Sequence, residues 1–217
     1  MAIMAGNWKN KCYDHFMKRI ENLSKKELEE TGRQIGAAFV HETGPFCDYF
    51  TEREASVYFT CLCQMAVSSH CLYELSDGKG YLIVWRKHHG PSFFQKLLFS
   101  FRISLKMDMN RMQKYMDALK PWKDYEEKYR HEKDYIDLFM VCIPEEEQGK
   151  GNLRKLLKEP MRIAEERNIP CILDTDSDVK MMKYRHIGFM VTDDLILPDG
   201  NHMYTMEYRL EKEKTAV

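Results

Sequence analysis

The chain has 217 residues, of which 44% are hydrophobic and 31% are charged, and its formal net charge is -1. This length suits one domain with a sizeable core, and the near balance of charges argues against a nucleic-acid-binding protein. No apolar run approaches the roughly 20 residues of a membrane span, and the N-terminus lacks the apolar stretch of a signal peptide. We therefore expect a cytoplasmic monomer or homodimer with neither a nucleic-acid nor a membrane partner.

The chain has seven cysteines, an odd number that is scattered through apolar stretches and does not indicate a disulfide framework. Cys61 and Cys63 are two positions apart, and no second pair follows at zinc spacing. His88, His89 and His186 also lack a third ligand at a useful spacing. The sequence therefore predicts buried thiols in a reducing compartment and no metal.

The first half of the chain favours helices around one hairpin. Residues 16–20 predict a short strand, and the patterns Ser24 to Glu27 and Thr51 to Glu54 are capping boxes that open two helices. Residues 71–75 and 81–86 predict two strands joined by a loop that contains glycine. Residues 91–130 are helical in pattern, with a break expected at Pro121, and residues 125–131 predict a solvated charged face.

Three methionines of this helical stretch fall on one helical face: Met109, Met112 and Met116. Core packing explains such a face most simply. A deformable substrate pocket is the alternative, because methionine side chains adapt to different shapes.

The second half alternates between strand and helix patterns. Residues 135–143 are apolar almost throughout, which is typical of a buried central strand. A helix at 151–167, a strand at 171–173, a helix at 178–186 and a hairpin of 189–197 with 203–210 follow. Pro160 lies inside the first of these helices and should kink it. This order predicts a mixed α/β architecture.

The segment from Gln148 to Gly151 lies between the buried strand and a helix. Its two glycines allow N–H groups to turn toward one point, and the helix adds unsatisfied donors and the positive end of its dipole. Such a site binds phosphate, and Lys150 adds charge. An ordinary strand-to-helix turn accounts for the same glycines, and neither the nucleoside triphosphate loop nor the dinucleotide fingerprint is present.

Three segments, IPEEEQGKGNLRKLL, PCILDT and KYRHIGF, together resemble the acetyl-CoA-binding core of the GNAT N-acetyltransferase superfamily. The first contains Gln148 to Gly151 in the place of the family's Q/R-x-x-G-x-G/A loop. The last contains Tyr184 a few residues before Gly188 and Phe189. A narrower resemblance, to the puromycin-acetyltransferase-like branch, is carried by Pro160, by Leu173-Asp174-Thr175 and by Pro198-Asp199-Gly200.

The resemblance implies an α/β fold of the GNAT type over residues 1–217, with the acetyl-CoA-binding core at 135–210. It implies a central mixed sheet of six or seven strands with helices on both faces. The fourth and fifth strands should splay apart, and residues 91–130 should form a helical insert between the third and fourth strands.

The resemblance also implies roles for particular residues. The backbone of the strand segment Val141, Cys142 and Ile143 should pair with the pantetheine arm. The pyrophosphate should be held by the N–H groups of the loop, which are those of Gly149, Lys150, Gly151, Asn152 and Leu153. Tyr184 corresponds to the general acid that protonates the leaving thiolate. Asp174 aligns with a carboxylate of the branch and is a candidate base, beside Glu42, His41, Glu74 and Asp137.

Two positions depart from the family pattern. Leu153 stands where the family has Gly or Ala, and Lys180 stands where the branch usually has Asn. Lys180 either reaches a phosphate or loses that contact. Cys142 is expected to be a buried thiol and not a nucleophile.

The predicted activity is therefore transfer of an acetyl group from acetyl-CoA to a primary amine of a small molecule. A protein-directed acyltransferase and a non-catalytic acyl-CoA-binding module remain alternatives.

Overall fold

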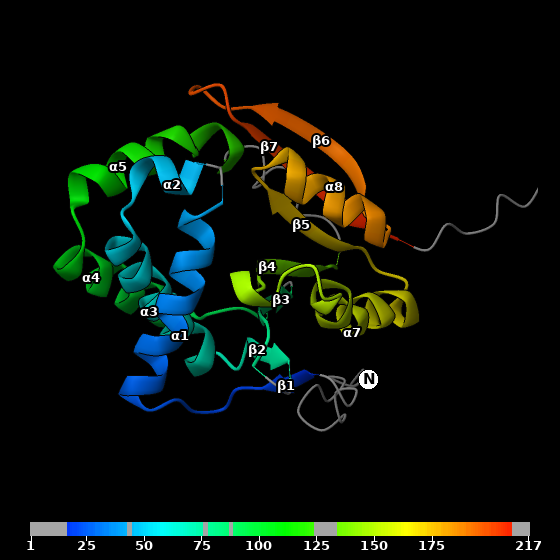
Figure 1. Ribbon diagram of the computed structural model, residues 1–217, viewed down its shortest axis with the longest axis horizontal. Helices are drawn as coiled ribbons and strands as arrows, with labels where there is room; N and C mark the ends of the chain where they lie inside the picture. Colours follow the sequence, from blue (N-terminus) through cyan, green and yellow to red (C-terminus); the bar gives the residue numbers. More distant parts are fainter. Residues whose placement is uncertain (1–16, 43–44, 76–77, 87–88, 124–133, 210–217) are drawn as a thin grey trace, which may run out of the picture.

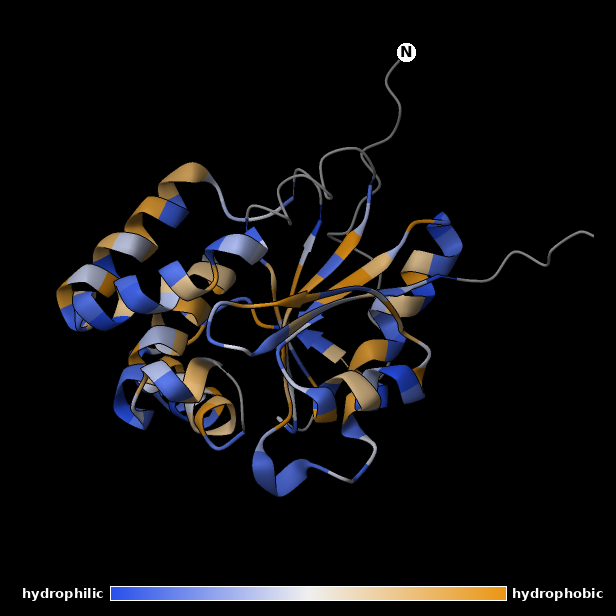
Figure 2. Ribbon diagram, turned by 90° about the horizontal axis from the view of Figure 1, so that it is seen from above, coloured by the Kyte–Doolittle hydropathy of each residue, from blue (hydrophilic) through white to orange (hydrophobic). Residues whose placement is uncertain are grey.

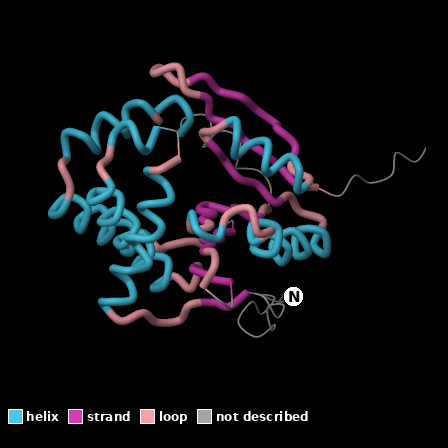
Figure 3. Tube along the Cα trace, viewed as in Figure 1, coloured by secondary structure: helices cyan, strands magenta, loops and turns pink. Residues whose placement is uncertain are grey.

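The computed structural model describes residues 17–42, 45–75, 78–86, 89–123 and 134–209. Seven strands form one mixed sheet in the order β1-β2-β3-β4-β5-β7-β6. The strands are β1 (Met17–Arg19), β2 (Leu72–Leu75), β3 (Tyr81–Arg86), β4 (Ile136–Cys142), β5 (Cys171–Thr175), β6 (Met190–Ile196) and β7 (His202–Tyr208). The helices are α1 (Lys25–Val40), α2 (Pro45–Tyr49), α3 (Glu52–Ser68), α4 (Phe93–Lys106), α5 (Met109–Ala118), α7 (Asn152–Arg167) and α8 (Asp178–Ile187). Figure 3 shows how the helices flank the strands.

Both predicted capping boxes are present. Ser24 and Glu27 cap α1, and Thr51 and Glu54 cap α3, with side chain and backbone bonded reciprocally in each case. These bonds satisfy N–H groups that have no partner within a helix. The helices therefore begin where the sequence predicts, and the predicted strands are also confirmed within the described residues.

The break predicted at Pro121 is confirmed to within two residues, because α5 ends at Ala118 with Leu119 as its C-cap and helical residues resume at Lys120. The chain leaves α4 at Met107 and re-enters a helix at the N-cap Asp108, whose carboxylate accepts from two backbone N–H groups of α5. Pro121 lies within the helical residues 120–123, near the start of that helical run, where a proline's missing N–H costs little. Residues 125–131 and part of the 77–80 loop lie outside the described residues.

The helices form two groups on opposite faces of the sheet (Figure 1). Helices α1 to α5 gather on one face over a core that includes Ile35, Phe59 and Ile83. Helices α7 and α8 cover the other face, over a core that includes Leu156 and Leu173. Figure 2 shows hydrophobic residues concentrated in strands at the middle of the molecule.

Helices α1 and α3 lie unusually close together. A Cβ atom added to Gly36 would lie 2.6 Å from the backbone nitrogen of Ser56, and one added to Gly32 would lie 2.6 Å from that of Thr60. Since real Cβ atoms do not approach a backbone so closely, these glycines permit the contact. The contact fixes the C-terminal end of α1, where the chain continues to Glu42.

The sheet opens between β4 and β5. Within the described residues the two strands pair in parallel at two positions, Ile136 with Cys171 and Asp137 with Ile172. Beyond Asp137, β4 continues beside β3, but no pairing joins it to β5. The predicted splay of the fourth and fifth strands is therefore present.

A β-bulge lies on the other edge of β4. Ile83 pairs with Met140 and Val84 pairs with Leu138, so that Phe139 is an extra residue. The Phe139 ring stacks on Trp85 with centroids 3.6 Å apart. The bulge thus places an aromatic pair beside the opening in the sheet.

Candidate functional site

A cavity of about 1480 Å³ follows the opening between β4 and β5. One part of its wall comes from the predicted phosphate loop, α8 and the ends of the two strands. The other part comes from α1, α3, α4 and α5. The cavity therefore connects the two faces of the sheet through the gap between the strands.

The predicted phosphate loop has the geometry of an anion site. Gly149 and Gly151 have φ angles of 73° and 76°, in the left-handed region that favours glycine. Gly151 is the N-cap of α7 and offers no side chain to the first N–H groups of the helix. No heavy atom lies within 4 Å of a Cβ built at either glycine. The N-terminus of α7 is therefore open to a phosphate.

The neighbouring side chains hold this loop in place. The Asn152 amide donates to the backbone oxygen of Glu147 at 3.1 Å and to its carboxylate at 3.2 Å. Leu153 packs partly against the core on the α7 face and also lines the cavity. Lys150 is exposed and forms an ion pair with Glu147 at 3.2 Å, and it is not among the described residues that line the cavity.

A partly buried cation, Lys180, lines the cavity. The Lys180 ammonium lies 3.1 Å from the Glu42 carboxylate and 3.2 Å from the Asp176 carboxylate. Burial lowers the pKa of Lys180, but Asp176 and Glu42 oppose this effect and raise the pKa above its ordinary value. Glu42 also accepts from the Gln148 amide at 3.3 Å, which links α1 to the phosphate loop.

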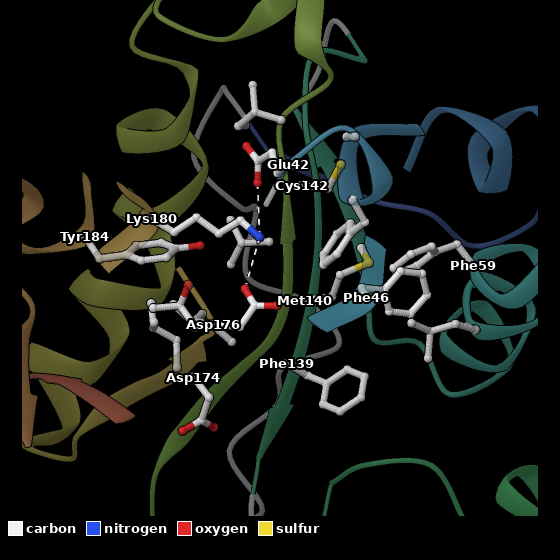
Figure 4. Close-up of a pocket in the computed structure, with 18 of the residues that line it drawn as sticks. Glu42, Phe46, Phe59, Phe139, Met140, Cys142, Asp174, Asp176, Lys180 and Tyr184 are labelled. Carbon is white, nitrogen blue, oxygen red and sulfur yellow. Dashed lines mark hydrogen bonds and ion pairs between the residues drawn. The ribbon is translucent and has the colours of Figure 1, made fainter. Parts of the chain in front are cut away.

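Tyr184 approaches this cluster from α8. Figure 4 shows its hydroxyl directed toward Lys180 and Asp176. Burial raises the pKa of Tyr184 well above its ordinary value, and the charges of Glu42 and Asp176 raise it further. The left-handed Gly188 ends α8, and its N–H donates to the Tyr184 carbonyl at 3.2 Å. The phenol is therefore held protonated at the opening in the sheet.

The candidate bases differ in position. Asp174 lines the cavity, but its carboxylate accepts from the Thr205 hydroxyl at 2.6 Å and points away from Tyr184 (Figure 4). Asp137 and Glu42 also line the cavity. His41 pairs with Glu145 and Glu74 pairs with Lys18, and neither belongs to the described cavity wall.

Asp176 is a site residue that the sequence analysis missed. Its spacing of four positions before Lys180 gave a signal, because such pairs interact across one helical turn. The pattern of the resemblance ends at Thr175 on this strand, and Asp176 lies just beyond it.

The far wall of the cavity is aromatic and rich in methionine. It includes Phe39, Trp85, Phe139, Tyr115 and Trp122. The predicted methionine face also lies here: Met112 is buried in the core, Met109 and Met116 are exposed, and all three line the cavity. Core packing therefore holds for Met112, and the deformable substrate pocket stays a prediction.

Three buried polar atoms of the cavity wall have no hydrogen-bond partner among the described residues. They are the Thr175 hydroxyl at the end of β5 and the indole nitrogens of Trp85 and Trp122. Buried polar groups are normally bonded.

Val141, Cys142 and Ile143 line the cavity. Burial raises the pKa of the Cys142 thiol well above its ordinary value, which makes it a poor nucleophile. Cys61, Cys63, Cys71 and Cys171 are also buried and free. In the described part of the chain no group of three His, Cys, Asp or Glu residues could hold a metal ion.

No family model matches the chain. An uncharacterized N-acetyltransferase of Schizosaccharomyces pombe is 22% identical over 211 residues, which cover 91% of this chain and 83% of the yeast protein. Among solved structures, arylalkylamine N-acetyltransferase 2 from Aedes aegypti matches with a TM-score of 0.58 at 11% identity. The match covers 89% of this chain and 97% of the mosquito chain.

A chain of the NatC complex bound to Gag peptide and CoA matches with a TM-score of 0.50 at 11% identity, covering 89% of this chain and 97% of that one. The sheet order, the splay and these similarities agree. The chain therefore has the fold of the GNAT N-acetyltransferases.

Proposed function

We propose that this protein is an acetyl-CoA-dependent N-acetyltransferase that transfers the acetyl group directly to a primary amine of a small molecule. The observation that carries the proposal is the position of Tyr184. Its buried phenol lies at the gap between β4 and β5, in one cavity with the open N-terminus of α7. The name of the yeast relative, an N-acetyltransferase, supports the same class of reaction.

Two parts of the chain fit the donor. The N–H groups of residues 149–153 would hold its pyrophosphate. The edge of β4 at Val141 to Ile143, where no pairing joins β4 to β5, would pair with the pantetheine arm as an added strand. Lys180 is engaged by Glu42 and Asp176, so we assign it to the centre of the cavity, beside the thioester, and not to the phosphates.

Tyr184 then acts as the general acid. The thiolate that leaves in acyl transfer needs a proton, and a phenol that stays protonated can donate it. The Val141 N–H is the proposed donor to the oxyanion. Asp174 remains a candidate for the base that accepts the proton of the amine. Glu42 and Asp176 join it because they pair with Lys180, toward which the Tyr184 hydroxyl points.

The acceptor is proposed from the cavity wall. The Aedes aegypti enzyme is named for arylalkylamines and the NatC structure holds a peptide, so the shared fold is compatible with either class of acceptor. The α4 and α5 helices contribute Phe99, Met112 and Tyr115 to the cavity wall, and we infer that they close it around a small molecule. The narrower likeness to the puromycin-acetyltransferase-like branch stays a prediction.

The test is calorimetric titration with acetyl-CoA and with coenzyme A, on the wild type and on two variants. Gly151→Asp puts a negative charge at the phosphate loop, and we expect at least about tenfold weaker binding than the wild type's micromolar range. Gly200→Asp is the matched control, because its φ of 85° and the open space around it are similar but it lies outside the cavity wall.

Equal affinity of the two variants for acetyl-CoA would show that the loop does not bind the donor. A panel of small amines and peptides, with detection of released thiol, then separates the alternatives. Turnover of peptides alone would favour a protein-directed enzyme. Binding of acetyl-CoA without any turnover would favour a non-catalytic module.

A further inference from the structure

Helix α4 presents a face of apolar side chains to solvent. Phe93 is 78% exposed, Phe94 79% and Leu105 69%. Leu97, Leu98 and Phe101 are exposed as well. At about 100° per residue these six positions fall within about 140° of the helix circumference. We name this set, Phe93, Phe94, Leu97, Leu98, Phe101 and Leu105, the α4 stripe.

The stripe is not the face that joins α4 to the core. Ile103 is the buried residue of α4, and Phe99 packs partly against the same core. On the helix these two positions lie opposite the centre of the stripe. Helix α4 is therefore apolar on two opposite faces, of which the core uses one. A contiguous exposed apolar patch of this kind usually marks an interaction site.

The charges of α4 have one sign. Lys96, Arg102 and Lys106 are its ionisable residues, and its sequence contains no Asp or Glu. Arg102 lies about 40° beyond Leu98 on the helix, and Lys96 lies about 60° beyond Phe93 on the opposite side. Cations therefore border both sides of the stripe, although the chain as a whole has a formal net charge of -1.

We propose that the α4 stripe docks on the surface of a bilayer that contains anionic phospholipid. Helices with a Phe- and Leu-rich face and a Lys- and Arg-rich border lie in the membrane interface, where the apolar side chains enter the acyl boundary and the cations meet lipid phosphates. Long basic side chains reach the headgroups while their stems stay apolar.

Charge favours this occupant over a second copy of the chain. In a symmetric contact between two α4 stripes, each copy brings the same three cations and no α4 carboxylate to neutralise them. An anionic lipid surface complements those cations. Since no described helix is long and apolar enough to cross a membrane, the proposed attachment is peripheral. It does not depend on the proposed acetyltransferase activity.

The experiment is co-sedimentation of the full chain with phosphatidylcholine vesicles and with vesicles that contain about 30% phosphatidylserine. We expect at least about tenfold stronger binding to the anionic vesicles. The double variant Phe94→Ser with Phe101→Ser removes two exposed rings and should weaken that binding at least about tenfold. Lys96→Gln with Arg102→Gln, which removes the two cations that border the stripe, should remove most of the preference for anionic lipid.

The control is Met190→Ser with Ile196→Ser, because these side chains of β6 are also apolar and are 49% and 65% exposed. This variant should bind as the wild type does. In a second measurement, Leu97→Trp adds an indole to the stripe, and its fluorescence should shift to shorter wavelength with anionic vesicles. Circular dichroism and thermal melting check that each variant is folded.

Three results would overturn the proposal. The wild type could fail to bind either vesicle, or the Phe94 and Phe101 variant could bind as tightly as the wild type. The third is a wild-type dimer in sedimentation velocity that the same variant abolishes while neither protein binds vesicles. That result would assign the stripe to contacts between copies of the chain.

Discussion

Tyr184 joins several elements through one side chain. Its ring packs edge to face on Phe189, with centroids 6.0 Å apart, and its hydroxyl faces the cluster of Lys180, Glu42 and Asp176 (Figure 4). The raised pKa means that the phenol carries its proton at and above neutral pH. A proton donor is therefore available across the range in which an amine becomes nucleophilic.

Replacing Tyr184 with Phe removes the donor and keeps the ring. We expect kcat to fall by about a hundredfold or more, while the Kd for acetyl-CoA changes by less than about threefold because the hydroxyl is not a phosphate contact. Steady-state kinetics and calorimetry measure the two quantities.

Tyr204→Phe is the control for that substitution. Its hydroxyl donates to Asp178, and Tyr204 is not among the described residues of the cavity wall. Its kcat should stay close to that of the wild type. A Tyr184→Phe variant whose binding falls as far as its turnover would show that the hydroxyl holds the donor and is not the acid.

Among single residues, the sequence pointed to Glu42 and Lys180 but not to Asp176, and it did not predict that these three charges form one cluster. Motif spacing identified Gly149, Gly151 and Tyr184. It did not identify Asp176, because the importance of Asp176 depends on Lys180 and on Glu42, which is 134 positions before Asp176 in the chain. Such a cluster exists only after α1 and α8 have been placed on either side of the gap.

Among the elements, α1 and α3 depend on an unusually close contact. Gly36 faces the backbone of Ser56, and this approach sets how closely the two helices pack. Helix α1 leads to Glu42. Packing of these two helices therefore affects both stability and the shape of the cavity.

Gly36→Ala should destabilise the fold by about 1–3 kcal/mol, because the new methyl group overlaps backbone that cannot move aside freely. The change measured is the free energy of unfolding in urea. Gly90→Ala is the matched control, since the nearest atom to its added Cβ is 3.7 Å away on the Trp85 ring and ordinary contact results. Equal stability of the two variants would mean that α1 and α3 can separate without cost.

Elements were largely predictable because their signals are local. Capping boxes mark the starts of α1 and α3, and alternation or apolar runs mark the strands. The break near Pro121 was predictable because proline is favoured in the first turn of a new helix, whereas the second break, between α4 and α5, was not predicted. The outer face of α4 was missed for a different reason: hydrophobic periodicity identifies an apolar face, but it does not say which face the core will cover.

In the whole molecule, the sheet is held together across its middle by the two β4–β5 pairs at Ile136 and Asp137. One part of the sheet contains β1 to β4, and the other contains β5, β7 and β6. The edge of β4 beyond Asp137 faces the cavity instead of a strand. Its amides should therefore respond to a ligand more than those of the outer strands.

Amide hydrogen exchange measures this response. On addition of coenzyme A we expect slower exchange in β4 beyond Asp137 and in the first turn of α7, with little change in β1 and β2. A uniform slowing throughout the sheet would indicate general stabilisation, and no change in β4 would contradict pairing of the pantetheine arm with that edge.

The splay was predicted from the family resemblance alone, because no local sequence pattern in β4 or β5 indicates where two parallel strands separate. The bulge at Phe139 could not be predicted either. It depends on the register between β3 and β4, and register is set by packing on both faces of the sheet.

The partial pairing of β4 with β5 has a practical consequence. A ligand that bridges the gap supplies contacts that the chain lacks by itself. Any compound that binds only the native state raises the melting temperature, by an amount that grows with the ratio of its concentration to its Kd. The melting temperature therefore reports ligand binding. Compound libraries could be ranked by it, acyl donors and acceptors alike, before a single product had been identified.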